Sequence, residues 1–526
     1  MNAVVPQTKI KDTCVAIAEF NRILKSNPTS LNAYYVRGKA YVREKNYEAA
    51  LKDFNFLLHL NPNLIRVYLI RGYVFGELQE YQSAIDDFSQ AIRINPQLAE
   101  AYYSRGNIYG VTEQYESAIA DYSKVVEMHP QNAQAYLNRG IAYSVIEKQK
   151  QAIADYTRVI RLKPTLDFAY YSRGNALGRI SEYQKAIADY SKTLELNPNR
   201  IEAYKNRATA YNFTERYQEA IADYTQALRL NPNDIEAYYN RGNVYALLEG
   251  HEIAIADYTQ AIHLDGKLHR AYVDRGDVYT IVEEYQKAIA DYTQAIRLDP
   301  EDKDSYRKRA KVYGILKGYQ IALADYSESI RIDSSNAEAY RNRGNVHGIL
   351  KNYQQAIADY SAAIEINPNY ADAFYHRGNA YSYQKNYKKA IADYSRAIYL
   401  EPDCAEIHYN RGIAYNELEE YQKAVDDYAI AIRLNLKTSQ VYNNRGIAYR
   451  NLSEYQSAIV DYTEAIRLNK NNVQAHYNRG LVYHHVGEKR KAVRDLGTTA
   501  ELFRQQGKND MCQHVLDTIM KLQGVA

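Results

Sequence analysis

Two sets of polar residues recur along this chain of 526 residues at spacings that could support chemistry. Arginine and aspartate recur at one fixed interval, as Arg207 and Arg241 and as Asp223 and Asp257. Asparagine and tyrosine recur at the same interval, in stretches such as YYNRGNVY at 238–245. Guanidinium and carboxylate groups form ion pairs, and an asparagine side chain offers one acceptor and two donors for hydrogen bonds. These residue types predict ion pairs between the arginines and the aspartates, and ligand binding by the asparagines and tyrosines.

Residue types that serve catalysis or hold metals are present, but they lack the arrangement that such chemistry needs. His476, His484 and His485 have no cysteine and no ordered acidic set beside them, so we expect exposed histidines and no metal site. Asp86 and Asp87 face different directions on a helix. No nucleophile motif and no phosphate-binding glycine loop is found. We expect a protein that is not an enzyme and that binds no cofactor.

The constant interval is 34 residues, as Gly38, Gly72 and Gly106 show. This repeat length indicates which elements position these groups. Counting units from residue 31, position 8 is glycine except at Ala208 and Ala310, and position 20 is always alanine. Apolar spacing predicts one helix over about positions 2–14 and a second over about 16–30, and proline near position 32 ends the second. We expect positions 8 and 20 to face each other. A hairpin of this size cannot bury its own apolar face, so the units must stack into a solenoid.

Position 7 is arginine and position 23 is aspartate in all fourteen units, from Arg37 and Asp53 to Arg479 and Asp495. Both positions adjoin the expected helix crossing, where an unpaired charge costs several kcal/mol. We expect each guanidinium to meet a carboxylate in a structural ion pair. The carboxylate belongs to the same unit or to the adjacent one, and the sequence leaves both arrangements open.

Stretches such as YYNRGNVY at 238–245 and IADYTQAIRL at 289–298 resemble the tetratricopeptide repeat (TPR) family, and the resemblance covers essentially the whole chain. The regular spelling resembles bacterial tandem arrays. Two departures are arginine at position 7, where leucine is usual, and tyrosine, phenylalanine or histidine at position 4, where tryptophan is usual. The resemblance implies an all-α fold, a right-handed superhelical α-solenoid of about fourteen helix-turn-helix units, whose concave groove is lined by positions 2, 5, 6, 9, 12 and 13.

Asparagine and tyrosine predominate at these groove positions. Position 6 carries Asn138, Asn206, Asn240, Asn342, Asn410, Asn444 and Asn478; position 9 carries Asn107, Asn175, Asn243, Asn345 and Asn379; position 5 carries Tyr103, Tyr171, Tyr239, Tyr375 and Tyr409. Glycine at position 12, as in Gly110 and Gly178, opposes helix formation by up to about 1 kcal/mol. A surface that binds extended peptides would explain this composition, and the residues are similar to the asparagine ladder of O-GlcNAc transferases. The alternative is a groove that is merely hydrated.

A second binding mode of the family, the carboxylate clamp for acidic C-termini of chaperones, is matched only in part. Lys205, Asn240 and Arg270 approach its pattern. Thr209 and Asp274 stand where asparagine and a basic residue are expected, so we do not expect docking of chaperone tails.

The ends of the chain differ from the array, and we predict three segments. Residues 1–30 form an N-terminal half-repeat with a single helix at 9–27, residues 31–506 form the fourteen units, and residues 507–526 form a capping helix with an apolar stripe. The eight residues before the first helix cannot form a partner helix. Cys14, Cys404 and Cys512 share no motif, so neither a disulfide nor a metal site is expected.

These observations predict a noncatalytic scaffold or adaptor that binds extended peptide segments of partner proteins in the groove. The alternative is a structural assembly scaffold that acts through its convex face or its ends by self-association. A net charge of +3 argues against nucleic acid as a partner. No apolar stretch reaches the length of a bilayer and the first residues lack the form of a secretory signal, so we expect no membrane partner and a cytoplasmic location.

Overall fold

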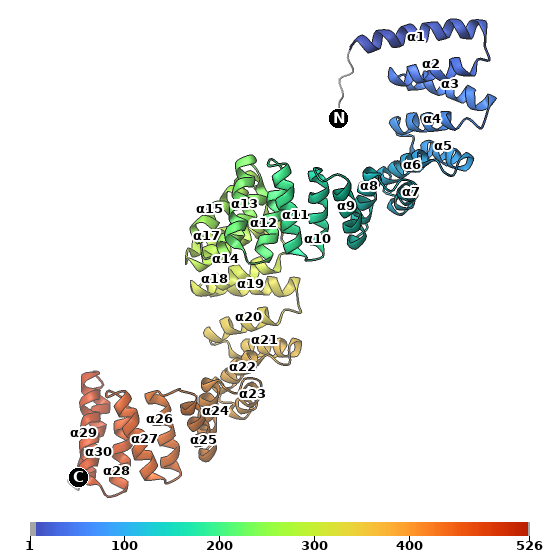
Figure 1. Cartoon of the computed structure of the whole chain (residues 1–526). Helices are drawn as coiled ribbons and strands as arrows, with labels where there is room; N and C mark the ends of the chain where they lie inside the picture. The colour runs from blue at the N-terminus through green and yellow to red at the C-terminus, as the bar shows by residue number, and fades with distance from the viewer. Residues whose placement is uncertain (1–6, 524–526) are drawn as a thin grey trace. The chain divides into compact units, whose positions relative to one another are not determined.

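The computed structural model describes residues 7–523, with side chains described for residues 15–522, and it contains thirty α-helices and no strand in that range (Figure 1). The chain divides into two compact units, residues 1–266 and 267–526, and each is described by itself. In each repeat the first helix has an even number and the second an odd one. No described helix combines the length and the apolar character that a membrane span requires.

The helices of the first unit are α1 (Gln7–Ser26), α2 (Leu31–Arg43), α3 (Tyr47–Leu60), α4 (Ile65–Glu77), α5 (Tyr81–Ile94), α6 (Ala99–Val111), α7 (Tyr115–Met128), α8 (Ala133–Val145), α9 (Gln149–Leu162), α10 (Asp167–Arg179), α11 (Tyr183–Leu196), α12 (Ile201–Phe213), α13 (Tyr217–Leu230), α14 (Ile235–Leu247) and α15 (His251–Leu264).

The helices of the second unit are α16 (His269–Ile281), α17 (Tyr285–Leu298), α18 (Lys303–Ile315), α19 (Tyr319–Ile332), α20 (Ala337–Ile349), α21 (Tyr353–Ile366), α22 (Ala371–Tyr383), α23 (Tyr387–Leu400), α24 (Ala405–Glu417), α25 (Tyr421–Arg433), α26 (Ser439–Asn451), α27 (Tyr455–Leu468), α28 (Val473–His485), α29 (Lys489–Gln505) and α30 (Asn509–Gln523). Within each unit, consecutive helices pack side by side.

The turn between the two helices of a repeat has the same backbone conformation throughout the array. Position 15 lies in the left-handed region, with φ between 58° and 63° from Lys45 to Ser453, and Gly487 takes this place in the last repeat. The next residue donates its N–H to the carbonyl of position 11, as Gly318 does to Tyr313 at 2.8 Å. This closure caps the first helix and starts the second, although glycine, the usual residue for such a cap, occurs there only once.

The glycine at position 8 makes room for an aromatic ring. A Cβ atom on Gly174 would lie 2.8 Å from Cε1 of Tyr190, which occupies position 24 of the same repeat. Position 20 is a more distant neighbour: in the last repeat, a Cβ atom on Gly480 would lie 3.4 Å from the carbonyl oxygen of Ala492. The last repeat thus shows the expected contact between positions 8 and 20, and the structure adds that the atoms closest to the glycine belong to position 24. The alanines at position 20, such as Ala186, are fully buried.

Each of the fourteen arginines pairs with the aspartate of its own repeat, which resolves the choice that the sequence left open. In repeat 5, Arg173 donates from Nε to Oδ2 and from Nη2 to Oδ1 of Asp189, both at 2.7 Å. Its third nitrogen, Nη1, donates to the hydroxyl of Thr157 in the preceding repeat at 3.0 Å. Within each compact unit, every arginine thus fixes its own hairpin and, wherever position 25 of the preceding repeat offers an acceptor, also the hairpin before it. Ala429 offers no side-chain acceptor to Arg445.

The two ends of the array are covered by single helices. Helix α1 packs against α2, and residues 1–6, which precede it, lie outside the described residues. Helix α30 packs against α29, and Cys512 and Val515 are buried against Leu496 and Ala500. Cys404 and Cys512 are free thiols, and the side chain of Cys14 lies outside the described range.

His476 corrects one prediction, because it is buried rather than exposed, with 8% of its surface accessible. It occupies position 4, where the ring packs inside the hairpin. Its Nε2 lies 3.1 Å from the carbonyl of Lys470 and its Nδ1 lies 3.7 Å from Asp495. His485 is exposed and packs against Tyr455, and residues 15–522 contain no cluster of side chains suited to a metal ion.

Candidate functional site

Each asparagine at position 9 is held by a tyrosine from the second helix of its own repeat. The hydroxyl of Tyr122 donates to Oδ1 of Asn107 at 2.9 Å. Burial raises the pKa of Tyr122 to about 12, so this hydroxyl stays protonated and donates. The same bond, at 2.8–2.9 Å, joins Tyr190 to Asn175, Tyr258 to Asn243, Tyr360 to Asn345 and Tyr394 to Asn379.

Asparagines at position 6 connect neighbouring repeats. The Nδ2 atom of Asn138 donates to Oδ1 of Asn107 at 3.1 Å and to the hydroxyl of Tyr103 at 3.2 Å, both in the preceding repeat. Two further sets of three residues make the same pair of bonds at 2.9–3.3 Å: Asn206 with Asn175 and Tyr171, and Asn410 with Asn379 and Tyr375. We call each set of position-5 tyrosine, position-9 asparagine and position-6 asparagine of the next repeat an amide cell.

An amide cell leaves hydrogen-bond donors available to a ligand. The Oδ1 atom of Asn107 already accepts two hydrogen bonds, and these two donors fix the orientation of its amide. Its Nδ2 atom makes no hydrogen bond to any described residue, and the side chain is half-buried. The Oδ1 atom of Asn175 is occupied in the same way. The cells of Asn107 and Asn175 therefore present N–H donors, and the groups that match them are acceptors such as peptide carbonyls.

The structure places the other predicted groove residues in three different settings. Asn444 donates to the hydroxyl of Tyr409 at 3.1 Å, so this pair continues the pattern. Asn240 and Asn342 follow repeats whose position 9 is threonine or lysine, where no amide is available to pair with them. Asn478 is buried, with 2% of its surface accessible, and Tyr239 is buried with 9% accessible.

Asn478 therefore has almost no surface to offer a ligand, contrary to expectation, and its Nδ2 donates to Oδ1 of Asn443 at 3.3 Å. Tyr239 packs against the ring of Tyr258, with 6.0 Å between the centroids.

At four of its five occurrences, glycine at position 12 is not required by the packing around it. A Cβ atom on Gly110, Gly178 or Gly348 would lie 3.6–3.7 Å from the hydroxyl of the tyrosine at position 24, and one on Gly314 would meet nothing within 4 Å. Gly76 differs, because its Cβ would lie 3.1 Å from Ile108. In the first three of these repeats, the glycine thus leaves space beside the tyrosine that holds a position-9 asparagine.

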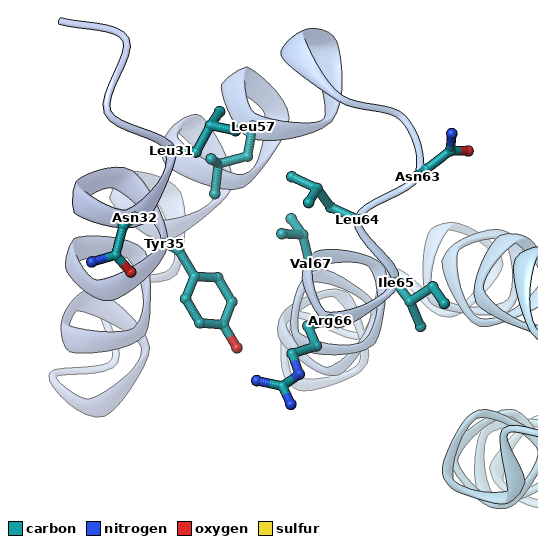
Figure 2. A pocket seen from close by; sticks show the side chains of 9 residues that line it. All are labelled: Leu31, Asn32, Tyr35, Leu57, Asn63, Leu64, Ile65, Arg66 and Val67. Atoms are coloured by element: carbon teal, nitrogen blue, oxygen red, sulfur yellow. The ribbon is translucent and has the colours of Figure 1, made fainter.

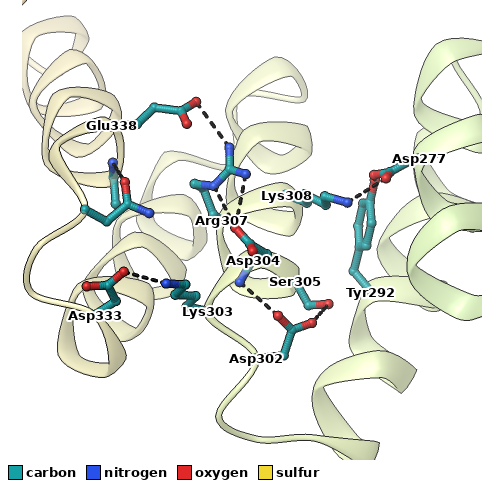
Figure 3. Close-up of polar contacts among 12 residues, drawn as sticks. Asp277, Tyr292, Asp302, Lys303, Asp304, Ser305, Arg307, Lys308, Asp333 and Glu338 are labelled. Atoms are coloured by element: carbon teal, nitrogen blue, oxygen red, sulfur yellow. Dashed lines mark hydrogen bonds and ion pairs between the residues drawn. The ribbon is translucent and has the colours of Figure 1, made fainter. Parts of the chain in front are cut away.

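A charged version of the same network connects repeats 8 and 9 (Figure 3). Tyr292 donates to Oδ1 of Asp277 at 2.8 Å, and Lys308 reaches Oδ2 of the same carboxylate at 2.5 Å. Asp277 stands at position 9 and Lys308 at position 6, so an ion pair replaces the two amides. Beside it, Arg307 pairs with Asp304 and with Glu338, both at 3.2 Å.

Two cavities border these positions, one in each unit. The first, of about 420 Å³, lies between repeats 1 and 2, and Figure 2 shows Tyr35 and Arg66 among the residues that line it. The second, of about 540 Å³, is lined by Tyr409 and Asn444, by Phe503 and Met511, and by further amides. Those amides are Gln440, Asn443, Asn469, Asn471, Asn472, Gln474 and Gln506. The second cavity joins two predicted residues to amides that sequence reasoning did not select.

Family models match the chain along most of its length. Models described as "TPR repeat" match residues 72–110, 214–248, 276–314 and 448–487. Models described as "Tetratricopeptide repeat" match residues 15–64, 99–132, 133–166, 168–200, 235–267, 337–370, 371–404 and 405–438. The comparison with curated proteins gives no match.

Among solved structures, the chain is similar to YrrB, described as a TPR protein with an unusual peptide-binding site, at 29% identity over 34% of this chain and 93% of that one, with a TM-score of 0.31. It is similar to MamA at 26% identity over 33% and 94%, with a TM-score of 0.32. Cut9, in the APC/C hetero-tetramer Cut9-Hcn1, shares 15% identity over 86% and 96%, with a TM-score of 0.36. These TM-scores support no inference on function. On the matches to the repeat models, this chain belongs to the tetratricopeptide repeat family.

Proposed function

We propose that the chain is a noncatalytic scaffold that binds extended peptide segments of partner proteins in the groove lined by its first helices. Repeats of this family support a role in protein–protein interaction, and nothing points to an enzymatic activity. The observation that carries the finer proposal is the amide cell, in which the oxygen of the position-9 asparagine is occupied within the chain while its nitrogen remains available.

The direction of the free hydrogen bonds sets the chemistry of the ligand. A peptide backbone offers one carbonyl acceptor per residue, and an extended chain exposes these acceptors because no helix consumes them. The absence of a side chain at Gly110 and Gly178 lets a ligand backbone approach the groove surface closely at these repeats. Each hydrogen bond contributes about 0.5–1.5 kcal/mol net, so several cells together support micromolar binding after the cost of association.

Replacing Asn107 and Asn175 with aspartate tests this proposal while keeping the cells intact. Each carboxylate can still accept hydrogen bonds from the position-24 tyrosine of its own repeat and from the position-6 asparagine of the next repeat. It cannot donate a hydrogen bond to a ligand carbonyl. We expect the double variant to lose about tenfold or more in affinity for peptides selected on the wild-type protein from a random library of about 15-residue peptides. Fluorescence anisotropy of individual selected peptides measures the loss.

Asn199→Asp with Asn233→Asp is the matched control, because both residues lie exposed in turns outside the groove and the added charge is the same. This control should bind the selected peptides as the wild type does. Equal affinity of the groove variant and the wild type would contradict the proposal. If only deletion of residues 1–30 removed binding, the surface would lie at the end of the array, as the assembly alternative requires.

A further inference from the structure

The C-terminal ends of three consecutive first helices, α18, α20 and α22, carry lysine and apolar side chains at matching places. Position 13 holds Ile315, Ile349 and Tyr383, whose exposed fractions are 47%, 59% and 70%. Position 15 holds a lysine in each of the three repeats, and all three lysines are exposed. The lysine–apolar rim consists of Ile315, Lys317, Ile349, Lys351, Tyr383 and Lys385.

The rim is positively charged over its whole length. Residues 313–323, 347–357 and 381–391, which form the three turns and their flanks, contain no aspartate and no glutamate. The same position 15 is acidic on both sides of the rim, as Glu283 and Glu419. In Figure 3, Lys303, Arg307 and Lys308 each reach a carboxylate, whereas no rim lysine forms an ion pair with any described residue.

The backbone of the rim is fixed before any ligand binds. Lys317, Lys351 and Lys385 have φ values of 60°, 62° and 61°, and the residue after each is hydrogen-bonded back to position 11 at 2.8 Å. Tyr383 stacks on Tyr353 of the preceding repeat, with 5.2 Å between the centroids and 10° between the planes. Exposed apolar groups and unpaired cations are thus held in a regular row, which lowers the entropy cost of binding.

We propose that the lysine–apolar rim binds an extended segment of a partner protein in which carboxylates alternate with apolar side chains. Three unpaired lysines call for a negatively charged occupant, and three exposed apolar side chains at fixed intervals call for apolar groups at the same intervals. The first helices of neighbouring repeats contact one another, so they lie about 8–10 Å apart. A chain in the extended polyproline II conformation rises about 3.1 Å per residue with three residues per turn, so the matching segment presents an apolar residue to the rim at about every third place.

This proposal goes beyond the amide cells, because the rim shares no residue with them. Its position-13 side chains border the groove, and its lysines at position 15 lie outside the positions assigned to the groove. An anionic bilayer and a second copy of this chain are the other occupants that its charge admits. An anionic bilayer would bind the lysines through charge alone, whatever the spacing of the apolar side chains. A second copy of the chain would have to present one of its own acidic turns to the lysines. Both are outcomes of the following experiment.

The probe is a synthetic peptide with leucine at every third residue and glutamate between, compared with the same peptide carrying lysine in place of glutamate. We expect the acidic peptide alone to bind the wild-type protein and to bind less tightly as salt is raised. Lys317→Glu, Lys351→Glu and Lys385→Glu together should reduce its affinity at least about tenfold and should confer binding of the basic peptide. Glutamate already occupies this position as Glu283, with φ of 61°, so the variant is expected to fold.

Matched single variants separate the site from general charge effects. Lys45→Glu changes an exposed lysine at the same position of repeat 1, with φ of 58°, and should leave peptide binding unchanged, whereas Lys351→Glu should weaken it. Ile349→Asn should also weaken it, and position 13 is natively asparagine at Asn451. Asn175→Asp should have no effect, which keeps the test independent of the groove.

Three results would overturn the proposal. The acidic peptide could bind the triple variant as tightly as the wild type. Vesicles of phosphatidylserine and phosphatidylcholine could bind through the rim while the peptide does not. Sedimentation velocity could show a wild-type dimer that the triple variant loses, which would make the second copy the occupant.

Discussion

Replacing Asp189 with alanine is expected to lower the free energy of unfolding of repeat 5 by about 3 kcal/mol, because the Arg173 guanidinium loses both of its carboxylate bonds. The side chains of Asp189 and Arg173 are 7% and 21% exposed, so water reaches the arginine only in part. The hydrogen bond to Asp189 raises the pKa of Arg173, and this increase is lost with the carboxylate. The guanidinium still stays charged, because the ordinary pKa of arginine lies far above neutral pH. An unpaired guanidinium in this partly buried site destabilises the folded repeat, which is why the expected loss is large.

Local stability is the quantity to measure, since a repeat array need not unfold in one step. Hydrogen exchange of the amides in α10 and α11 reports it. Thr157→Ala removes the bond to the preceding repeat together with the bond from Thr157 to the carbonyl of Ile153, and it should cost about 1 kcal/mol. A cycle of Arg173→Leu and Asp189→Leu should show a double variant more stable than the sum of the single effects predicts. Strictly additive effects would mean that the two groups do not stabilise each other.

Replacing Gly174 with valine is the second change with a large expected effect, of about 2–3 kcal/mol. The new Cβ would lie 2.8 Å from the ring of Tyr190, which fills the core of the hairpin and is 3% exposed. Alanine should cost less, because Ala208 and Ala310 occupy this position in two repeats and their tyrosines remain buried.

Gly178 offers a control on the same helix and against the same tyrosine. Its Cβ would lie 3.7 Å from the hydroxyl of Tyr190, so Gly178→Ala should raise the stability of α10 by up to about 1 kcal/mol. Hydrogen exchange of the amides in α10 and α11 compares the variants. Equal destabilisation by Gly174→Val and Gly178→Val would contradict the role assigned to position 8. If the groove binds peptides, Gly178→Ala should weaken that binding while it stabilises the helix.

Periodicity made the hairpins and their stacking predictable, but it could not choose the partner of each arginine. Arg173 lies almost midway along the chain between Asp155 and Asp189, so separation in sequence does not favour either carboxylate. The path of the turn between the two helices determines which aspartate pairs with each arginine. The residue of this turn in the left-handed region is mostly lysine, glutamate or serine, where sequence rules expect glycine.

The internal bonds of the amide cells were not predicted, because they join residues of different repeats that are far apart in the sequence. The sequence did hold a signal: asparagine at position 6 follows asparagine at position 9 of the preceding repeat in Asn107 and Asn138 and in Asn175 and Asn206. Asp277 and Lys308 exchange both amides for opposite charges at the same two positions. Paired changes of this kind indicate contact even within one chain.

The amide cells of Asn107 and Asn175 are two repeats apart and chemically alike. If the cells bind peptide segments as proposed, a flexible partner with two suitable segments, separated by about six extended residues, can engage both at once. The second contact then forms at the high effective concentration that the short connection imposes. Such avidity would let individually weak segments give long-lived complexes, and a partner with a single segment would exchange rapidly between the two equivalent places.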